Sequence, residues 1–336
     1  MHRQRPRTLL AMGRGTAQRV LSGPVVDRLV EVAYVDPALV ASDFYHPEIR
    51  AALADTEVLL TSWGCPPLTE DVVNAAPRLQ AVVHAAGTVK MHVTAACWER
   101  GIRVSSAATA NAMPVAEYTV AAILWANKRV LEIAADYRDR RDFTDWGGNP
   151  RIGNFRKTVG VVGASRVGRR VLELLRMFDV DVLLSDPYVH GDEGAALGAR
   201  VVPLPELMQA SDVVSVHAPD LPTTRHMIGA PELALMRDGG ILINTARPAV
   251  IDQKALTKEL VARRLSAILD VTEPEPLPAD SVLFDLENVF LTPHIAGSLG
   301  GELARIADAA VDELERYSLG LPFAHEVKPE ELERSA

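Results

Sequence analysis

The chain has 336 residues, 48% hydrophobic and 24% charged, which fits a globular protein long enough for two domains. Its formal net charge of −9 argues against a nucleic-acid partner, because such proteins carry a basic face. The two cysteines, Cys65 and Cys97, cannot build a disulfide framework and lack metal-ligand spacing. We therefore expect no bound metal and reduced thiols in a cytoplasmic protein.

The N-terminus is basic, but its apolar run, Leu9 to Met12, is too short for the hydrophobic region of a signal peptide. No apolar run reaches the roughly 18 residues that a membrane span needs. The best candidate, Val115 to Trp125, is shorter and contains Glu117. The sequence thus predicts no membrane partner and a first β-strand close to the N-terminus.

The first 108 residues alternate apolar runs with helical patterns. We expect helices at Thr69–Ala76 and His92–Arg100, and Thr69 followed by Glu70 and Asp71 is typical of a helix start. Strands are expected within the runs RTLLAM, EVLLTSW, LQAVVHAAG and IRVSSA. Because strands that alternate with helices indicate parallel βαβ units, residues 1–108 should form one small α/β domain.

A longer helix follows, which Pro114 would open and which would end near Arg129. Residues 137–154 are polar and are expected to form a loop. Residues 301–319 have helical periodicity, and the acidic tail after Pro322 is expected to fray. Between these lie seven strand candidates: TVGVVG, VDVLLSD, ARVVPL, DVVSVHA, GGILINTA, LSAILDV and VFLTPH. This series predicts a complete doubly wound sheet.

The strongest local motif lies between the first of these strands and the following helix. It reads Gly163-Ala164-Ser165-Arg166-Val167-Gly168, and Asp186 ends the next strand. Glycines permit a tight turn, a helix N-terminus attracts a pyrophosphate, and the carboxylate can accept hydrogen bonds from a ribose. Ser165 stands where the motif has its middle glycine. The same residues could instead form a tight turn that binds no ligand. The strand before them, the helix after them and the spacing of Asp186 favour a dinucleotide-binding turn.

Polar side chains follow three later strands: Arg247, then Asp270, Glu273 and Glu275, then His294. Ligands bind at the carboxyl ends of parallel strands in this architecture. An arginine fork can bind a carboxylate, and an acid beside a histidine orients the ring and favours its protonated form. Each residue alone has a plain interpretation as a surface or structural group. Together they predict a site with a proton donor near neutral pH.

Arg247, the Glu-Pro pair at Glu275 and the Thr-Pro-His turn at His294 resemble the Arg/Glu/His set of the D-isomer-specific 2-hydroxyacid dehydrogenases. The segment PVAEYTVAAILWANKR is also similar to that family. The branches that the chain resembles are the glyoxylate/hydroxypyruvate reductases and the phosphoglycerate dehydrogenase-like enzymes. The resemblance implies an NAD-dependent dehydrogenase that interconverts a small 2-oxo acid and its D-2-hydroxy acid, with His294 as the general acid/base.

The resemblance also implies an architecture of two doubly wound parallel-sheet α/β domains. A Rossmann NAD-binding domain, residues 109–299, would be inserted in a flavodoxin-like substrate domain formed by residues 1–108 and 300–336, with the active site in the cleft between them. The family forms homodimers through the nucleotide domain, so we expect a homodimer.

Cofactor and substrate residues also follow from the resemblance. NAD would be bound by Gly163, Ser165, Arg166, Val167, Gly168, Asp186, Ala218, Thr245, Ala246 and Asp270, the last at the nicotinamide amide. The substrate carboxylate would be bound by Arg247 and by backbone amides of Ala86, Gly87 and Thr88. Pro248 replaces a glycine usual in the family, and Val89-Lys90-Met91-His92 replaces a Gly-Val-Asp-Asn-like sequence, so the substrate stays open.

Other functions remain compatible with the residues. A non-catalytic NAD-sensing protein similar to the corepressors of this fold is one, although the complete Arg/Glu/His set argues against it. Oxidation of phosphite would use the same set, whereas formate dehydrogenases pair the histidine with glutamine. Lys90 either lies on a solvated helix start, with Trp63 in the core, or favours a second anionic group in a pocket shaped by Trp63.

Overall fold

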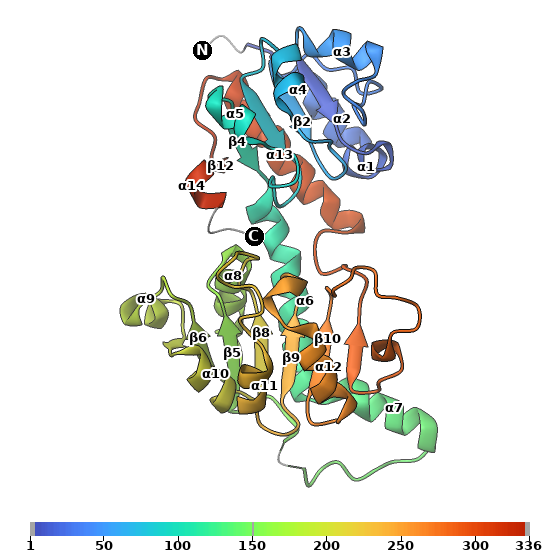
Figure 1. Ribbon diagram of the computed structural model, residues 1–336, viewed down its shortest axis with the longest axis vertical. Helices are drawn as coiled ribbons and strands as arrows, with labels where there is room; N and C mark the ends of the chain where they lie inside the picture. The colour runs from blue at the N-terminus through green and yellow to red at the C-terminus, as the bar shows by residue number, and fades with distance from the viewer. Residues whose placement is uncertain (1–3, 150, 333–336) are drawn as a thin grey trace. The chain divides into compact units, whose positions relative to one another are not determined.

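The computed structural model describes residues 4–149 and 151–332, which divide into two compact α/β units (Figure 1). Unit 1 contains the chain through Ala112 and again from Ser298, and unit 2 is Met113–Gly297. The sequence predicts boundaries at 108/109 and 299/300.

Unit 1 is built on a mixed sheet whose described strands follow the order β1-β2-β3-β4-β12. The strands are β1 (Thr8–Ala11), β2 (Val58–Thr61), β3 (Ala81–His84), β4 (Arg103–Ser106) and β12 (Glu326–Val327). The first four pair in parallel, as predicted, whereas β12 pairs antiparallel with β4. Isolated parallel bridges of Tyr34 with Arg7 and of Val40 with Leu10 place this segment of the chain beside β1. If the segment is counted as the second strand in chain order, the parallel part of the sheet has the order 2-1-3-4-5 that is typical of flavodoxin-like sheets.

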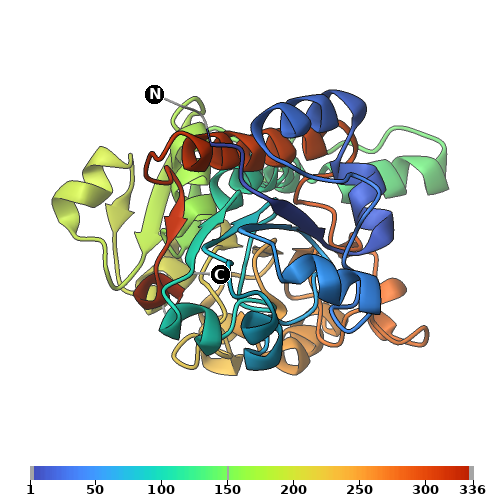
Figure 2. The same ribbon diagram turned by 90° about the horizontal axis from the view of Figure 1, so that it is seen from above.

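Helices cover both faces of this sheet, because successive strand residues point to opposite sides. The helices of unit 1 are α1 (Arg14–Val20), α2 (Gly23–Val32), α3 (Pro47–Leu53), α4 (Glu70–Ala75), α5 (Ala95–Glu99), α13 (Leu303–Ser318) and α14 (Pro329–Leu332). Leu10 and Leu60 pack with α2 and α13, whereas Leu9 and Leu59 pack with α3 and α4. Figure 2 shows α13 in red beside the blue N-terminal helices, so both ends of the chain complete one layer.

Unit 2 contains all seven predicted strands, and every pair among them is parallel. They are β5 (Lys157–Val162), β6 (Val180–Ser185), β7 (Arg200–Val201), β8 (Val213–Val216), β9 (Ile241–Asn244), β10 (Ser266–Leu269) and β11 (Val289–Leu291). Their order, β11-β10-β9-β8-β5-β6-β7, reverses direction between β5 and β8. A doubly wound sheet binds ligands outside the carboxyl ends of its strands at this switch point.

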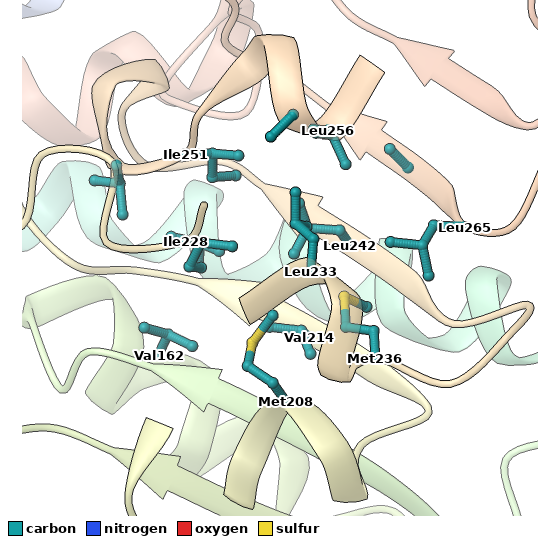
Figure 3. Packing of buried hydrophobic residues seen from close by; sticks show 14 of the residues in the cluster. Val162, Met208, Val214, Ile228, Leu233, Met236, Leu242, Ile251, Leu256 and Leu265 are labelled. Atoms are coloured by element: carbon teal, nitrogen blue, oxygen red, sulfur yellow. The ribbon is translucent and has the colours of Figure 1, made fainter. Parts of the chain in front are cut away.

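Both faces of the unit 2 sheet carry helices. These are α6 (Ala108–Asn127), α7 (Val130–Arg140), α8 (Arg166–Leu175), α9 (Gly191–Ala196), α10 (Leu204–Ala210), α11 (Ala230–Leu235) and α12 (Gln253–Val261). Figure 3 shows one of the two cores, in which Val214 and Leu242 of the sheet meet Met208, Leu233 and Leu256 of α10, α11 and α12. The other core packs α6 and α8 on the opposite face. The carboxyl ends of the strands are therefore held at fixed positions.

Four sequence predictions about elements were wrong. Helix α6 begins at Ala108, not at Pro114, because the Ala108 amide donates to Ser106 Oγ at 3.1 Å and so starts the helix earlier. The expected loop from residue 137 is helical through Arg140, as the end of α7. Helix α5 begins at Ala95 rather than at residue 92. The tail after Pro322 does not fray within the described residues, because β12 pairs with β4 and α14 follows.

Membrane crossing would require a longer and more apolar helix than any that the described residues form. Those residues also contain no group of three or more His, Cys, Asp or Glu side chains placed to bind a metal ion.

Candidate active site

The glycine-rich turn after β5 packs directly against the end of β8. Gly163 has φ +95°, and a Cβ atom there would lie 2.6 Å from the Ala218 amide nitrogen. A Cβ at Gly168 would lie 2.1 Å from the Gly163 carbonyl oxygen. Both positions therefore require glycine, because any side chain would push the turn away from β8 and from the start of α8. The turn brings Gly163, Gly168 and Ala218 together, as the dinucleotide motif predicts.

Ser165 occupies the middle position of this motif without disturbing the turn. It has φ −62°, which any residue adopts, and its Oγ accepts a hydrogen bond from the Gly168 amide at 3.3 Å. The serine is thus the N-cap of α8, and Arg166 and Val167 are the first residues of that helix. The helix N-terminus still presents the amides of its first turn, so the serine is compatible with a bound pyrophosphate.

Asp186 lies at the end of β6 and is tied to the same turn. Its Oδ2 accepts a hydrogen bond from the Ala164 amide at 2.7 Å, and its Oδ1 accepts one from the Tyr188 amide at 2.8 Å. The carboxylate is therefore fixed beside the glycine turn, and its oxygens keep acceptor capacity for a ribose hydroxyl. His217, just after β8, is buried, and its Nε2 lies 2.8 Å from Ser215 Oγ.

Arg247 follows β9 in a turn that the side chain of Asn244 holds together. The buried Asn244 side chain accepts a hydrogen bond from the Ala246 amide and donates one to the Arg247 carbonyl oxygen, both at 3.0 Å. Pro248 is the first residue of the short 3-10 helix Pro248–Val250. A proline suits that position because its fixed φ is helical and its missing N–H would lack a partner there anyway.

The side chain of Arg247 is half-buried. Its Nη1 donates a hydrogen bond to the Ala246 carbonyl oxygen at 2.8 Å. Burial lowers the pKa of Arg247, while the charges of Asp220 and Glu275 act in the opposite direction. An arginine stays charged in proteins even so. The geometry thus leaves a partly desolvated cation next to Glu275, which strengthens its attraction for an anion.

Glu275 and His294 form the central pair of the site. Oε1 of Glu275 lies 2.7 Å from Nδ1 of His294. Because a carboxylate can only accept, the ring carries its proton on Nδ1, which leaves Nε2 to exchange a proton with a ligand. Their side chains are 39% and 52% exposed, respectively, so the pair contributes little to stability. Its main effect is to orient the ring.

A buried carboxylate, Asp270, holds the turn that carries His294. Asp270 is 2% exposed, and its Oδ1 accepts hydrogen bonds from Thr292 Oγ1 at 2.7 Å and from the Ile295 amide at 2.8 Å. Its Oδ2 accepts one from the Ala296 amide at 2.9 Å. His294 has φ +55° between these anchors, in the left-handed region. Asp270 therefore acts on the position of His294, a role that the sequence pattern did not reveal.

Helix α6 supports the turns of Arg247 and His294 through two hydroxyl pairs. Tyr118 Oη lies 2.7 Å from Thr292 Oγ1 in the His294 turn, and Thr119 Oγ1 lies 2.8 Å from Thr245 Oγ1 in the Arg247 turn. Burial raises the pKa of Tyr118, so the phenol keeps its proton. The adjacent tyrosine and threonine of the segment PVAEYTVAAILWANKR were the signal in the sequence, because they are hydroxyls within a mostly apolar stretch.

The predicted substrate loop, Ala86 to Thr88, follows β3 in unit 1. Ser62 Oγ donates to the Ala85 carbonyl oxygen at 2.9 Å, and Ser106 Oγ donates to the carbonyl oxygens of Ala86, at 3.2 Å, and Gly87. In a trans peptide the next N–H points opposite to the carbonyl. Three successive carbonyls thus point inward, and the amides of Ala86, Gly87 and Thr88 turn outward.

Comparisons with known proteins agree with this geometry. Residues 120–296 match the family described as "D-isomer specific 2-hydroxyacid dehydrogenase, NAD binding domain". The chain is 34% identical over 258 residues to a glyoxylate reductase from Korarchaeum cryptofilum, covering 76% of this chain and 77% of the relative. It is 33% identical over 276 residues to a D-3-phosphoglycerate dehydrogenase from Methanocaldococcus jannaschii, covering 80% and 51%, so the chain spans about half the length of that relative.

Solved structures show the same fold. The TT0316 protein from Thermus thermophilus matches with a TM-score of 0.74 and 29% identity, over 96% of this chain and 100% of that one. The family domain covers the glycine turn, Asp186 and the turns of Arg247 and His294. A nicotinamide cofactor therefore fits unit 2. The chain belongs to the D-isomer specific 2-hydroxyacid dehydrogenase family.

Proposed function

We propose that the protein is an NAD-dependent oxidoreductase that interconverts a small 2-oxo acid and its D-2-hydroxy acid. The observation that carries this proposal is the 2.7 Å contact between Glu275 and His294, in a turn clamped by the buried Asp270. A histidine oriented by a carboxylate, together with a half-buried arginine, provides a proton donor and a group that binds an anion.

His294 is the general acid in reduction and the general base in oxidation. In reduction, the protonated ring donates from Nε2 to the substrate carbonyl oxygen as that oxygen gains negative charge, and in oxidation the neutral Nε2 accepts the hydroxyl proton. Glu275 keeps the other ring proton on Nδ1 and stabilises the imidazolium form. When bound, the nicotinamide supplies the hydride for reduction or accepts it in oxidation.

Arg247 and the unit 1 loop bind negative charge. The partly desolvated guanidinium suits a carboxylate, which it can bind through two parallel hydrogen bonds. The outward amides of Ala86, Gly87 and Thr88 suit an anionic group as well, because the preceding carbonyls are held inward by Ser62 and Ser106. We propose each of them, in its own unit, as a group that can bind a substrate carboxylate.

The cofactor residues in our proposal are those of the glycine turn, Asp186, Ala218 and the residues that end β9, Thr245 and Ala246. Asp186 favours NAD over NADP, since its fixed carboxylate would repel a 2′-phosphate on the ribose. Asp270 also lies in this region, although its hydrogen bonds tie it to the His294 turn.

We also propose that the protein is a homodimer of the cytoplasm. Helix α7 has no buried residue, and Figure 1 shows it projecting from unit 2. Phe143, just after it, is 90% exposed and stacks on Tyr137 at 5.7 Å between ring centroids. An exposed aromatic pair of this kind is typical of an interface. The expected result by light scattering at micromolar concentration is a dimer mass, and a monomer mass would contradict the proposal.

The charge of the substrate is a further part of the proposal, and Lys90 is the residue that tests it. Lys90 and Met91 are exposed, and Trp63 is 40% exposed rather than in the core as one interpretation of the sequence had it. One relative is named for D-3-phosphoglycerate, which carries a second anionic group. We propose that Lys90 favours such substrates. Lys90→Ala should raise KM for a dianionic substrate more than KM for glyoxylate, and equal effects would refute this.

The proposed activity is tested by NADH consumption with glyoxylate, hydroxypyruvate, pyruvate, phenylpyruvate and phosphonopyruvate. We expect turnover with at least one, and a strong rise in KM for Arg247→Lys, which keeps the charge but loses the fork. Binding of NADH without turnover of any 2-oxo acid would contradict the proposed activity.

A further inference from the structure

Two buried histidines share one threonine hydroxyl in unit 1. Thr61 Oγ1 lies 2.9 Å from Nδ1 of His84 and 3.3 Å from Nε2 of His92. Both histidines are 3% exposed, Thr61 is fully buried, and the two ring centroids are 4.5 Å apart. Buried polar rings are costly unless they are hydrogen-bonded, so this cluster needs a specific proton arrangement.

The cluster lies at both ends of the substrate loop. His84 is the last residue of β3 and directly precedes the loop, whereas His92 follows it, after Lys90 and Met91. The backbone of Thr88, within the loop, is a hydrogen-bond partner of the His84 ring and raises its pKa. The Thr61 hydroxyl thus links the histidine before the loop to the histidine after it, and the His84 ring also interacts with the backbone of Thr88.

The number of available protons fixes the direction of these hydrogen bonds. The Thr61 hydroxyl has one hydrogen, which it could donate to the Val83 carbonyl oxygen at 3.5 Å or to one ring. Because the contact with His84 Nδ1 at 2.9 Å is the shortest, we assign the hydrogen to that contact, and the hydroxyl then accepts from His92. His84 then accepts from Thr61 at Nδ1 and carries its proton on Nε2, and the backbone of Thr88 acts to raise the pKa of the same ring. His92 must then donate from Nε2 to Thr61. Burial lowers the pKa of both rings, that of His92 to about 4, in agreement with two neutral rings.

We propose that Thr61, His84 and His92 form a neutral clasp that fixes the Ala86–Thr88 loop in its anion-binding conformation. The three are positioning residues, because they act on the backbone of the loop and not on the substrate. With Ser62 and Ser106 on its other carbonyls, the clasp completes a set of inward-pointing peptides from Ala85 to Thr88. The inference rests on the proposed function only in that the ligand of the loop is a substrate carboxylate.

The test compares Thr61→Val with Thr61→Ser. Valine keeps the volume but removes the hydroxyl that both rings share, whereas serine retains it. We expect Thr61→Val to raise KM for the 2-oxo acid at least about tenfold, with kcat and the Kd for NADH changed less than about threefold. Thr61→Ser should remain within about twofold of wild type in all three. Equal KM values for the two variants would overturn the clasp.

A second readout does not depend on turnover. ¹⁵N NMR of the histidine side chains at neutral pH should show His84 and His92 as neutral rings protonated on Nε2, and Thr61→Val should alter both signals. A protonated ring, or a proton on Nδ1 of either residue, would overturn the proposal even if the protein is an active dehydrogenase. Conversely, the expected tautomers with no 2-oxo acid turnover would leave the clasp intact and reject only the proposed activity.

Discussion

The substitution Asp270→Asn tests how the His294 turn is held. The aspartate is 2% exposed and accepts three hydrogen bonds, from Thr292 Oγ1, the Ile295 amide and the Ala296 amide, at 2.7–2.9 Å. Asparagine has the same shape but only one acceptor oxygen. Its NH2 group would face one of the donors that the carboxylate now satisfies.

The expected cost follows from these bonds. A hydrogen bond to a charged group contributes about 1.5–3 kcal/mol, and one between neutral groups contributes about 1 kcal/mol. In Asp270→Asn, the two hydrogen bonds to the remaining oxygen become neutral and therefore weaker. The third is lost, because the new NH2 group faces a backbone N–H, which is also a donor. Together this lowers the free energy of unfolding of unit 2 by about 4 kcal/mol. For a unit of this size, Tm should fall by roughly 8–16 °C.

Thermal unfolding followed by circular dichroism measures this change directly. Glu273→Gln is the matched control, because Glu273 lies on the same loop but is exposed, with Arg225 at 3.4 Å as a surface partner. We expect the control to shift Tm by less than about 2 °C. We also expect kcat for reduction to fall about tenfold or more in Asp270→Asn, since a displaced His294 donates its proton poorly. A Tm within the range of the control would refute the role of Asp270 as the clamp.

Three further predictions concern the cofactor turn and the buried histidines. Gly163→Ala should abolish measurable NADH binding by fluorescence titration, because φ is +95° and the new Cβ would lie 2.6 Å from the Ala218 amide nitrogen; binding of wild-type strength would contradict the close packing. Asp186 should give NAD at least about tenfold higher kcat/KM than NADP, and equal values would disprove its role. The free energy of unfolding should fall as the pH is lowered. Burial lowers the pKa of His92 to about 4 and that of His217 to about 3. Below about pH 6.5 the unfolded chain therefore binds protons that these two rings do not bind in the folded chain. For His92 alone the loss at pH 5 is about 2 kcal/mol, and a urea-unfolding free energy that is flat between pH 7 and pH 5 would argue against neutral buried rings.

The parts of the fold that could be predicted are those with a strong local pattern. The seven strands of unit 2 are short apolar runs bounded by turn residues, and they pair in one parallel sheet. Thr69 is the N-cap of α4, as its acidic neighbours indicate, and accepts a hydrogen bond from the Val72 amide at 3.4 Å. The Glu275–His294 pairing was predictable because each residue follows a neighbouring parallel strand.

The remainder depends on contacts between distant residues. Strand β12 is two residues long, and it is a strand only because Glu326 pairs with Ser105 and Val327 with Val104. Asp270 looks like one of several loop acids until its hydrogen bonds to the His294 turn are known. The same holds for Thr61, His84 and His92, which lie in separate segments and have no shared motif.

His294 is the proposed proton donor, and one measurement tests this role most directly. His294→Ala should lower kcat for reduction of the best 2-oxo acid at least about 10²-fold, because general acid catalysis is lost. The Kd for NADH should stay nearly unchanged, since the glycine turn and Asp186 are untouched, and His226→Ala, which removes an exposed histidine of the same unit, should leave kcat intact. If His294→Ala retained most of its kcat, the assignment of His294 as the general acid would be wrong.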